Sequence, residues 1–233
     1  MTNTIKHIFF DLDNTLWDFN KNSREALLQL FHESSLEHHL NTEFHYFLKV
    51  YEEINHHLWH KYHLNQTTKE ELRYLRFHQT FQEFKYQNLE LAKEWADKYL
   101  LISPYKTHLI TGTIEVLNHL NPKYDLHIIT NGFKEVQHIK LKESNLNDYF
   151  KNVIISEEHG FNKPDLKIFE LAQNLANAKH EECIMIGDNF ETDIKGALNA
   201  NWKAIYLAKE APNNFEHAQF THIDNLVKLT EML

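Results

Sequence analysis

Short apolar runs alternate with helical patterns along most of this 233-residue chain, and this alternation limits the folds open to it. The predicted strands are His7–Phe10, Leu126–Thr130, Val153–Ile155, Cys183–Ile186 and Ala204–Leu207. Apolar residues three or four positions apart predict helices between them, for example Ile114–Leu120, Lys134–Lys142, Leu166–Leu175 and Asp193–Ala200. Continuously apolar strands that alternate with helices predict an α/β fold, with a parallel sheet covered by helices on both faces.

A helical block interrupts this alternation after the first strand. Residues 23–101 contain neither glycine nor proline, and apolar residues recur there at helical spacing. Thr67 or Thr68, followed by Glu70 and Glu71, predicts a capping box at the start of one of these helices. We therefore expect a core made of residues 1–17 and 106–233, with residues 18–105 inserted as an all-helical domain.

Composition narrows the classes of function. The apolar fraction of 42% suffices for a packed core, and the net charge of −9 disfavours binding to a nucleic acid polymer. The single cysteine, Cys183, lies in an apolar run and is predicted to be a core residue. We find no apolar run long enough for a signal peptide or a membrane span, so we expect no membrane partner and a cytoplasmic location.

Histidine is frequent, with 18 residues, and four of them gather at His56, His57, His60 and His63. Their spacing would suit a metal site. The segment lacks a glutamate placed as in the zincin helix motif, so our interpretation is an amphipathic helix with solvated imidazoles.

Polar residues follow four of the predicted strands. They are Asp11 and Asp13, then Thr130, Asn131 and Gly132, then Lys163, and finally Gly187, Asp188 and Asp193. In open α/β sheets, ligands bind beyond the carboxyl ends of the strands. Although Thr130, Lys163 and Asp193 each have an ordinary structural explanation when taken singly, the whole set predicts one functional site at that edge.

This pattern resembles the four motifs of the haloacid dehalogenase superfamily. The matching elements are Asp11-x-Asp13-x-Thr15, Thr130, Lys163, and Gly187-Asp188 followed by Asp193. The helical block after the first motif is similar to that superfamily's C1-type cap. The resemblance implies a Rossmann-like core with sheet order 3-2-1-4-5.

The resemblance also implies a chemistry for the acidic residues. Asp11 would attack phosphorus and form an aspartyl-phosphate, while Asp13 would act as general acid and then as general base. The dehalogenases attack carbon and need no acid for the leaving group. The presence of Asp13 therefore indicates a phosphate ester as the substrate. Mg²⁺ would be held by the carboxylates of Asp11 and Asp188 and by the backbone carbonyl of Asp13, with Asp193 supporting Lys163 or a metal-bound water.

Four further residues would contact the phosphate group of the substrate. We expect the Thr130 hydroxyl and the Asn131 and Gly132 amides to reach phosphate oxygens, aided by the N-terminus of the next helix. Lys163 would supply a positive charge to the phosphate and the nucleophile. Pro164 is predicted at the first position of the following helix.

A narrower resemblance concerns the substrate. It rests on the stretches Asp11–Trp17, Ile129–Phe133, Gln137–Leu141, Asp148–Phe150, Ile155–Glu158, Lys163–Pro164 and Leu58–Trp59. Together they are similar to the bacterial pyrimidine-type 5'-nucleotidases, which hydrolyse nucleoside monophosphates. Trp17, Asp18 and Phe19 are then substrate contacts or, alternatively, a packed hinge.

Other functions stay open at this point. They are a phosphatase of a sugar phosphate or phosphoglycolate, a phosphomutase, and a non-catalytic binding module. The expected partner is a small phosphorylated metabolite, with the chain acting as a monomer or homodimer.

Two asparagines stand where the family often has glycine. Asn145 and Asn201 each follow a predicted helix, at a position that suits a left-handed backbone. Because asparagine tolerates that conformation better than other side chains, we predict positive φ at both residues.

Overall fold

The computed structural model describes residues 5–64 and 66–233. The chain divides into two compact units. One contains the residues up to Phe19 together with Thr107–Leu233, and the other is Asn20–Lys106.

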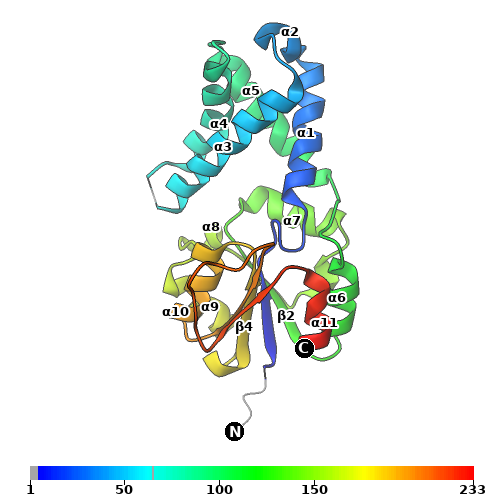
Figure 1. Cartoon of the computed structure of the whole chain (residues 1–233), viewed down its shortest axis with the longest axis vertical. Coiled ribbons are helices and arrows are strands. Elements are labelled where there is room, and N and C mark those ends of the chain that lie inside the picture. The colour runs from blue at the N-terminus through cyan, green and yellow to red at the C-terminus, as the bar shows by residue number, and fades with distance from the viewer. Residues whose placement is uncertain (1–4, 65) are drawn as a thin grey trace. The chain divides into compact units, whose positions relative to one another are not determined.

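A parallel sheet forms the centre of the first unit (Figure 1). Its strands are β1 (His7–Phe10), β2 (Asp125–Thr130), β3 (Asn152–Ile155), β4 (Cys183–Gly187), β5 (Lys203–Leu207) and β6 (Phe220–Ile223). The order β3-β2-β1-β4-β5-β6 confirms the predicted order and adds one edge strand. The sequence did not reveal β6, because only Ile223 of its four residues is buried and its apolar pattern is weak.

Helices cover both faces of this sheet, as Figure 1 shows. They are α6 (Thr113–Leu120), α7 (Lys134–Glu143) and α11 (Leu229–Met232) on one face, and α9 (Leu166–Leu175) and α10 (Lys195–Asn199) on the other, with the short α8 (Ser156–His159) after β3. Alternate residues of β1 enter different cores: Ile8 and Phe10 face α6, and Phe9 faces α9. All three are fully buried, and each contributes roughly 1.5–3 kcal/mol of hydrophobic stabilisation.

Two helix ends confirm the prediction for the asparagines. Asn145 has φ of 56° and Asn201 has φ of 59°. The next amide in each case, that of Leu146 or Trp202, donates back to a carbonyl five residues earlier, at 2.8 and 2.9 Å. This is the Schellman arrangement, which needs the left-handed residue to turn the chain.

The segments that lead out of the first unit and back into it pair with each other. The Asp18 amide donates to the His108 carbonyl at 3.0 Å, and the Ile110 amide donates to the Leu16 carbonyl at 2.9 Å. Between these two hydrogen bonds, Trp17 and Leu109 form an antiparallel β-bridge, and the Trp17 side chain is fully buried. The two connecting segments are therefore paired with each other and anchored in the core of the sheet unit.

The second unit is all helical. Its helices are α1 (Phe19–Glu33), α2 (Leu36–Leu40), α3 (Phe44–His63), α4 (Lys69–Glu83) and α5 (Leu89–Ile102). Trp95 is fully buried among the aromatic rings of Phe47, Phe77 and Phe81, at centroid distances of 5.5–5.8 Å in edge-on contacts. Thr68 and Glu71 form the predicted capping box at the start of α4.

Among the described residues, no group of possible metal ligands includes a histidine of helix α3. His56, His57 and His60 are exposed, as predicted, whereas His63 is half-buried beside Trp59. Within the described residues, no helix has both the length and the apolar character needed to cross a bilayer.

Two buried histidines lie on neighbouring strands of the sheet. His7 Nδ1 lies 3.3 Å from His127 Nε2, and His127 Nδ1 lies 2.9 Å from the side-chain nitrogen of Asn152. His127 also stacks on Phe9 at 4.5 Å. Burial, together with the charge on His7, lowers the pKa of His127 to about 4.

Because this pKa is low, the folded protein binds fewer protons than the unfolded chain between pH 6.5 and pH 4. The free energy of unfolding should therefore fall as the pH drops through this window, with about 2–3 kcal/mol of the fall due to His127. In His127→Gln the fall should be smaller by that amount, measured by urea unfolding at pH 7 and pH 4.5. The exposed control His38→Gln should behave like the wild type, and equal falls in all three proteins would contradict the prediction.

Candidate active site

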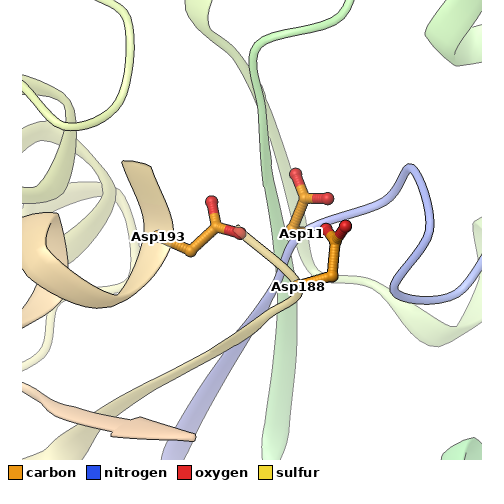
Figure 2. A group of neighbouring side chains, drawn as sticks. All are labelled: Asp11, Asp188 and Asp193. Carbon is orange, nitrogen blue, oxygen red and sulfur yellow. The ribbon is translucent and has the colours of Figure 1, made fainter. Parts of the chain in front are cut away.

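Three carboxylates converge at the carboxyl edge of the sheet (Figure 2). Asp11 follows β1, Asp188 follows β4, and Asp193 lies in a π-helical turn, Phe190–Ile194, just before α10. One oxygen from each carboxylate lies within 4.8 Å of the others. The sequence prediction that residues after different strands meet at one place therefore describes these three correctly.

Lys163 lies between two of these carboxylates. Its Nζ is 2.6 Å from Asp11 Oδ1 and 2.7 Å from Asp193 Oδ1, and the whole side chain is buried. Burial disfavours the charged ammonium, but the two carboxylates outweigh burial and raise the pKa of Lys163 above its ordinary value. The two carboxylates therefore favour the charged ammonium, which fixes the direction of Asp11.

The backbone at Lys163 is held by Asn131. Asn131 Oδ1 accepts from the Lys163 amide at 2.9 Å and from the Ser156 hydroxyl at 2.7 Å, and its Nδ2 donates to the Lys163 carbonyl at 2.9 Å. The Asn131 side chain thus positions the lysine loop. Sequence reasoning proposed only the backbone amide of this residue as a contact and missed this role.

The prediction for Pro164 is wrong. Helix α9 begins at Leu166, and Asp165 is its N-cap, with its side chain accepting from the Lys167 amide at 2.9 Å. An aspartate satisfies a free amide at a helix start, so the helix begins after Asp165 and Pro164 lies outside it.

A glycine allows Asp193 to approach the strand. A Cβ atom on Gly187 would lie 2.2 Å from Asp193 Oδ2, which leaves no space for any other residue at the end of β4. The same Asp193 oxygen accepts from the Asn189 amide at 3.1 Å. Asp193 is therefore held by the backbone on one side and by Lys163 on the other.

The charge in this cluster is unbalanced. Asp11, Asp188 and Asp193 bring three negative charges when ionised, and Lys163 brings one positive charge. Burial, and then the neighbouring carboxylates Asp11 and Asp193, raise the pKa of Asp188. Burial likewise raises the pKa of Asp11, with Lys163 opposing the shift.

The donor set fits a divalent cation. An excess of two negative charges, carried by oxygen atoms in a buried place, matches a hard ion with charge +2. Thr15 Oγ1 donates to Asp188 Oδ1 at 3.3 Å, which orients that carboxylate. Asp11 and Asp188 could hold the ion directly, whereas both oxygens of Asp193 are already engaged, Oδ1 by Lys163 and Oδ2 by the Asn189 amide.

Thr130, at the end of β2, has a defined hydroxyl. Its Oγ1 accepts from the Gly132 amide at 3.2 Å and from Gln137 Nε2 at 2.6 Å. A hydroxyl has two acceptor lone pairs and one proton, so with both lone pairs used the proton remains free to act as a donor. The free proton supports the predicted hydrogen bond from Thr130 to a phosphate oxygen. The Gly132 amide, which we had expected to donate to the substrate, instead donates to Thr130.

The N-terminus of α7 also differs from expectation. The Lys134 amide donates to Glu157 Oε2 at 2.9 Å. A carboxylate of the protein thus occupies the first turn that was predicted to assist a bound phosphate.

Sequence reasoning missed two residues that hold Asp13. Lys140 Nζ lies 2.6 Å from Asp13 Oδ1, and Gln137 Nε2 donates to Asp13 Oδ2 at 2.9 Å. Both are buried on α7, three positions apart and therefore on one face of the helix. Buried polar side chains at helical spacing are the signal that could have identified them.

The predicted substrate contacts Trp17, Asp18 and Phe19 lie at the hinge. Trp17 is fully buried, and its ring lies 4.4 Å from Lys140 Nζ, which favours the packed-hinge alternative for this residue. Asp18 and Phe19 are partly exposed where α1 begins. For them, contact with substrate stays a prediction.

Comparisons with known proteins define the class. The family model described as haloacid dehalogenase-like hydrolase matches residues 5–201, and this chain belongs to that family. Pyrimidine 5'-nucleotidase PynA of Streptococcus pneumoniae is 31% identical over 219 residues, which cover 93% of this chain and 90% of that protein. N-acylneuraminate-9-phosphatase of Homo sapiens is 31% identical over 206 residues, covering 86% of this chain and 81% of that protein.

A solved structure extends the likeness to three dimensions. The HAD-hydrolase YfnB from Bacillus subtilis, in a structure bound to magnesium, superposes with a TM-score of 0.87. It is 26% identical in sequence, and the superposition covers 98% of each chain.

The crowded carboxylates should make the metal-free protein less stable at high pH. Because the pKa of Asp188 is raised in the folded state, stability present at low pH is lost as the pH rises through that pKa. Asp188→Asn should therefore be more stable than the wild type in EDTA at pH 8, by on the order of 1–2 kcal/mol. The difference should shrink at pH 5, measured by urea unfolding, and a less stable variant at pH 8 would contradict the prediction.

Proposed function

We propose that this chain is a Mg²⁺-dependent phosphomonoester hydrolase that forms an aspartyl-phosphate on Asp11. One observation carries the proposal. A nucleophilic carboxylate is held by a buried ammonium at 2.6 Å, and a second carboxylate, Asp13, stands two residues along the chain. Attack on carbon needs no acid for the leaving group, whereas hydrolysis of a phosphate ester does, so Asp13 supports phosphorus as the target.

The residues suit Mg²⁺. In this proposal the carboxylates of Asp11 and Asp188 and the backbone carbonyl of Asp13 hold the ion, and Asp193 stands behind them. The ion would offset the repulsion between these carboxylates and an incoming phosphate dianion. The magnesium bound to YfnB supports the choice of metal.

In the first step, an Asp11 carboxylate oxygen attacks phosphorus in line with the ester oxygen. The bond from phosphorus to that ester oxygen breaks, and Asp13 gives its proton to the departing alkoxide. Lys163 favours the ionised form of the attacking carboxylate and fixes its direction, and the Thr130 hydroxyl proton can donate to a phosphate oxygen.

In the second step, Asp13 has lost its proton and can accept one from water. The water oxygen then attacks phosphorus, and the bond between phosphorus and Asp11 breaks. Inorganic phosphate leaves, Asp11 returns to its carboxylate form, and Asp13 is protonated again.

For the substrate we propose nucleoside 5'-monophosphates. The similarity to PynA, and to pyrimidine 5'-nucleotidase YjjG of Escherichia coli at 30% identity over 201 residues, supports this class. The second candidate is another small phosphate ester. N-acylneuraminate-9-phosphatase and a glyceraldehyde 3-phosphate phosphatase of Methanothermobacter thermautotrophicus, 32% identical, favour that alternative.

Turnover of 4-nitrophenyl phosphate should require Mg²⁺ and Asp11. Asp11→Asn should lower kcat at least about 1,000-fold, because the amide cannot form the covalent intermediate. The exposed matched control Asp224→Asn should retain wild-type activity. The rate of 4-nitrophenol release is measured by absorbance with Mg²⁺ or with EDTA. Full activity in Asp11→Asn or in EDTA would refute the mechanism.

A substrate panel tests the proposed class of substrate. We expect the highest kcat/KM among pyrimidine and purine 5'-monophosphates, measured by phosphate release beside sugar phosphates and phosphoglycolate. A higher value for a substrate without a nucleoside would favour the second candidate and leave the phosphatase mechanism intact.

A further inference from the structure

Asp13 lies in a turn after β1 and is partly exposed, yet both of its carboxylate oxygens have fixed partners. Lys140 Nζ contacts Oδ1 at 2.6 Å, and Gln137 Nε2 contacts Oδ2 at 2.9 Å. The side chain of Asp13 therefore owes its direction to helix α7 rather than to its own turn. Each contact uses one lone pair of its oxygen, so a second lone pair can carry the proton of the acid form. A carboxyl group that delivers a proton to one oxygen atom needs such a fixed direction.

Gln137 connects Asp13 to the rest of the site. Its Nε2 donates to Thr130 Oγ1 at 2.6 Å as well as to Asp13, so one amide group uses both of its protons on two predicted site residues. The amide lies against Gly132, where a Cβ would approach Gln137 Nε2 to 2.2 Å. Gly132 thus creates the space that this link occupies.

Lys140 is also held by contacts with other residues. It is buried, and its ammonium lies 4.4 Å from the ring centroid of the fully buried Trp17 and 2.6 Å from Asp13 Oδ1. The ion pair with Asp13 and the contact with the ring together compensate for the loss of water around the charge. Trp17 in turn belongs to the core of the sheet unit, so Asp13 is tied to that core through Lys140.

We infer that Lys140 and Gln137 are positioning residues that aim the Asp13 carboxyl group at the leaving oxygen of the substrate. This inference rests on the proposed function and adds two residues to it. They act through Asp13 and need no contact with phosphate, metal or Asp11.

The role has a kinetic signature, because leaving groups differ in how much they need a proton. A phenol of high pKa departs poorly as an anion and depends on Asp13, whereas 2,4-dinitrophenolate departs without help. If the Asp13 carboxyl group loses its fixed direction, kcat/KM should therefore fall strongly for phenyl phosphate and little for 2,4-dinitrophenyl phosphate. The parameter kcat/KM covers the steps up to departure of the alcohol, so it isolates the acid role of Asp13 from the later attack by water.

The experiment measures kcat/KM for a series of substituted phenyl phosphates with wild type, Lys140→Met and Gln137→Met. For phenyl phosphate we expect a loss of about tenfold to a hundredfold in each variant, and for 2,4-dinitrophenyl phosphate a loss of less than about threefold. Lys140→Arg should restore part of the phenyl phosphate rate. Lys142→Met, the same change on an exposed residue of α7, should match the wild type.

Two results would overturn the inference. They are an equal loss on all substrates, which a general structural defect would produce, and no loss on any of them. Thermal melting of each variant identifies unfolded protein, and Gln137→Met provides the readout if Lys140→Met does not fold. A wild type without Mg²⁺-dependent turnover would instead overturn the proposed function, together with the inference that rests on it.

Discussion

The buried ammonium of Lys163 is the charge on which the arrangement of the site depends. Three carboxylates meet at one edge of the sheet, where burial makes each negative charge costly. Lys163 contacts two of them at 2.6 and 2.7 Å and so fixes both Asp11 and Asp193. Without it the carboxylates would have to separate, take up protons or admit water, and Asp11 would lose its direction.

Several surrounding residues hold Lys163 and the neighbouring site residues in place. Asn131 uses both ends of its side-chain amide on the Lys163 backbone, and its oxygen also accepts from the Ser156 hydroxyl. Gly187 and Gly132 have no side chain where Asp193 and Gln137 must pass. These are close approaches between segments far apart in sequence, and the parallel sheet brings them together because its strands all end at the same edge.

A second charge pair stands beside the first. Lys140 Nζ lies 2.6 Å from Asp13 and balances the negative charge that Asp13 carries once it has given up its proton, so the excess negative charge stays with Asp11, Asp188 and Asp193. The two pairs therefore separate two tasks. One prepares a nucleophile beside a place suited to a cation, and the other directs a carboxyl group for proton transfer.

The sequence by itself determined the α/β alternation, the helical insertion and the residues that follow each strand. These depend on local spacing: a strand is a short apolar run, a helix repeats every three or four residues, and a left-handed helix end favours asparagine, as at Asn145 and Asn201. Strand β6 was missed because a half-exposed edge strand has little apolar pattern.

Only the tertiary structure decided which atoms of those residues are engaged. Asn131 is a tether, the Gly132 amide turns to Thr130, Trp17 is buried, and Lys140 reaches Asp13 across 127 positions of sequence. Spacing along the chain carries no information about such pairs. They are selected by the cost of leaving a buried charge or hydrogen-bonding group without a partner, and that cost exists only once the chain has packed.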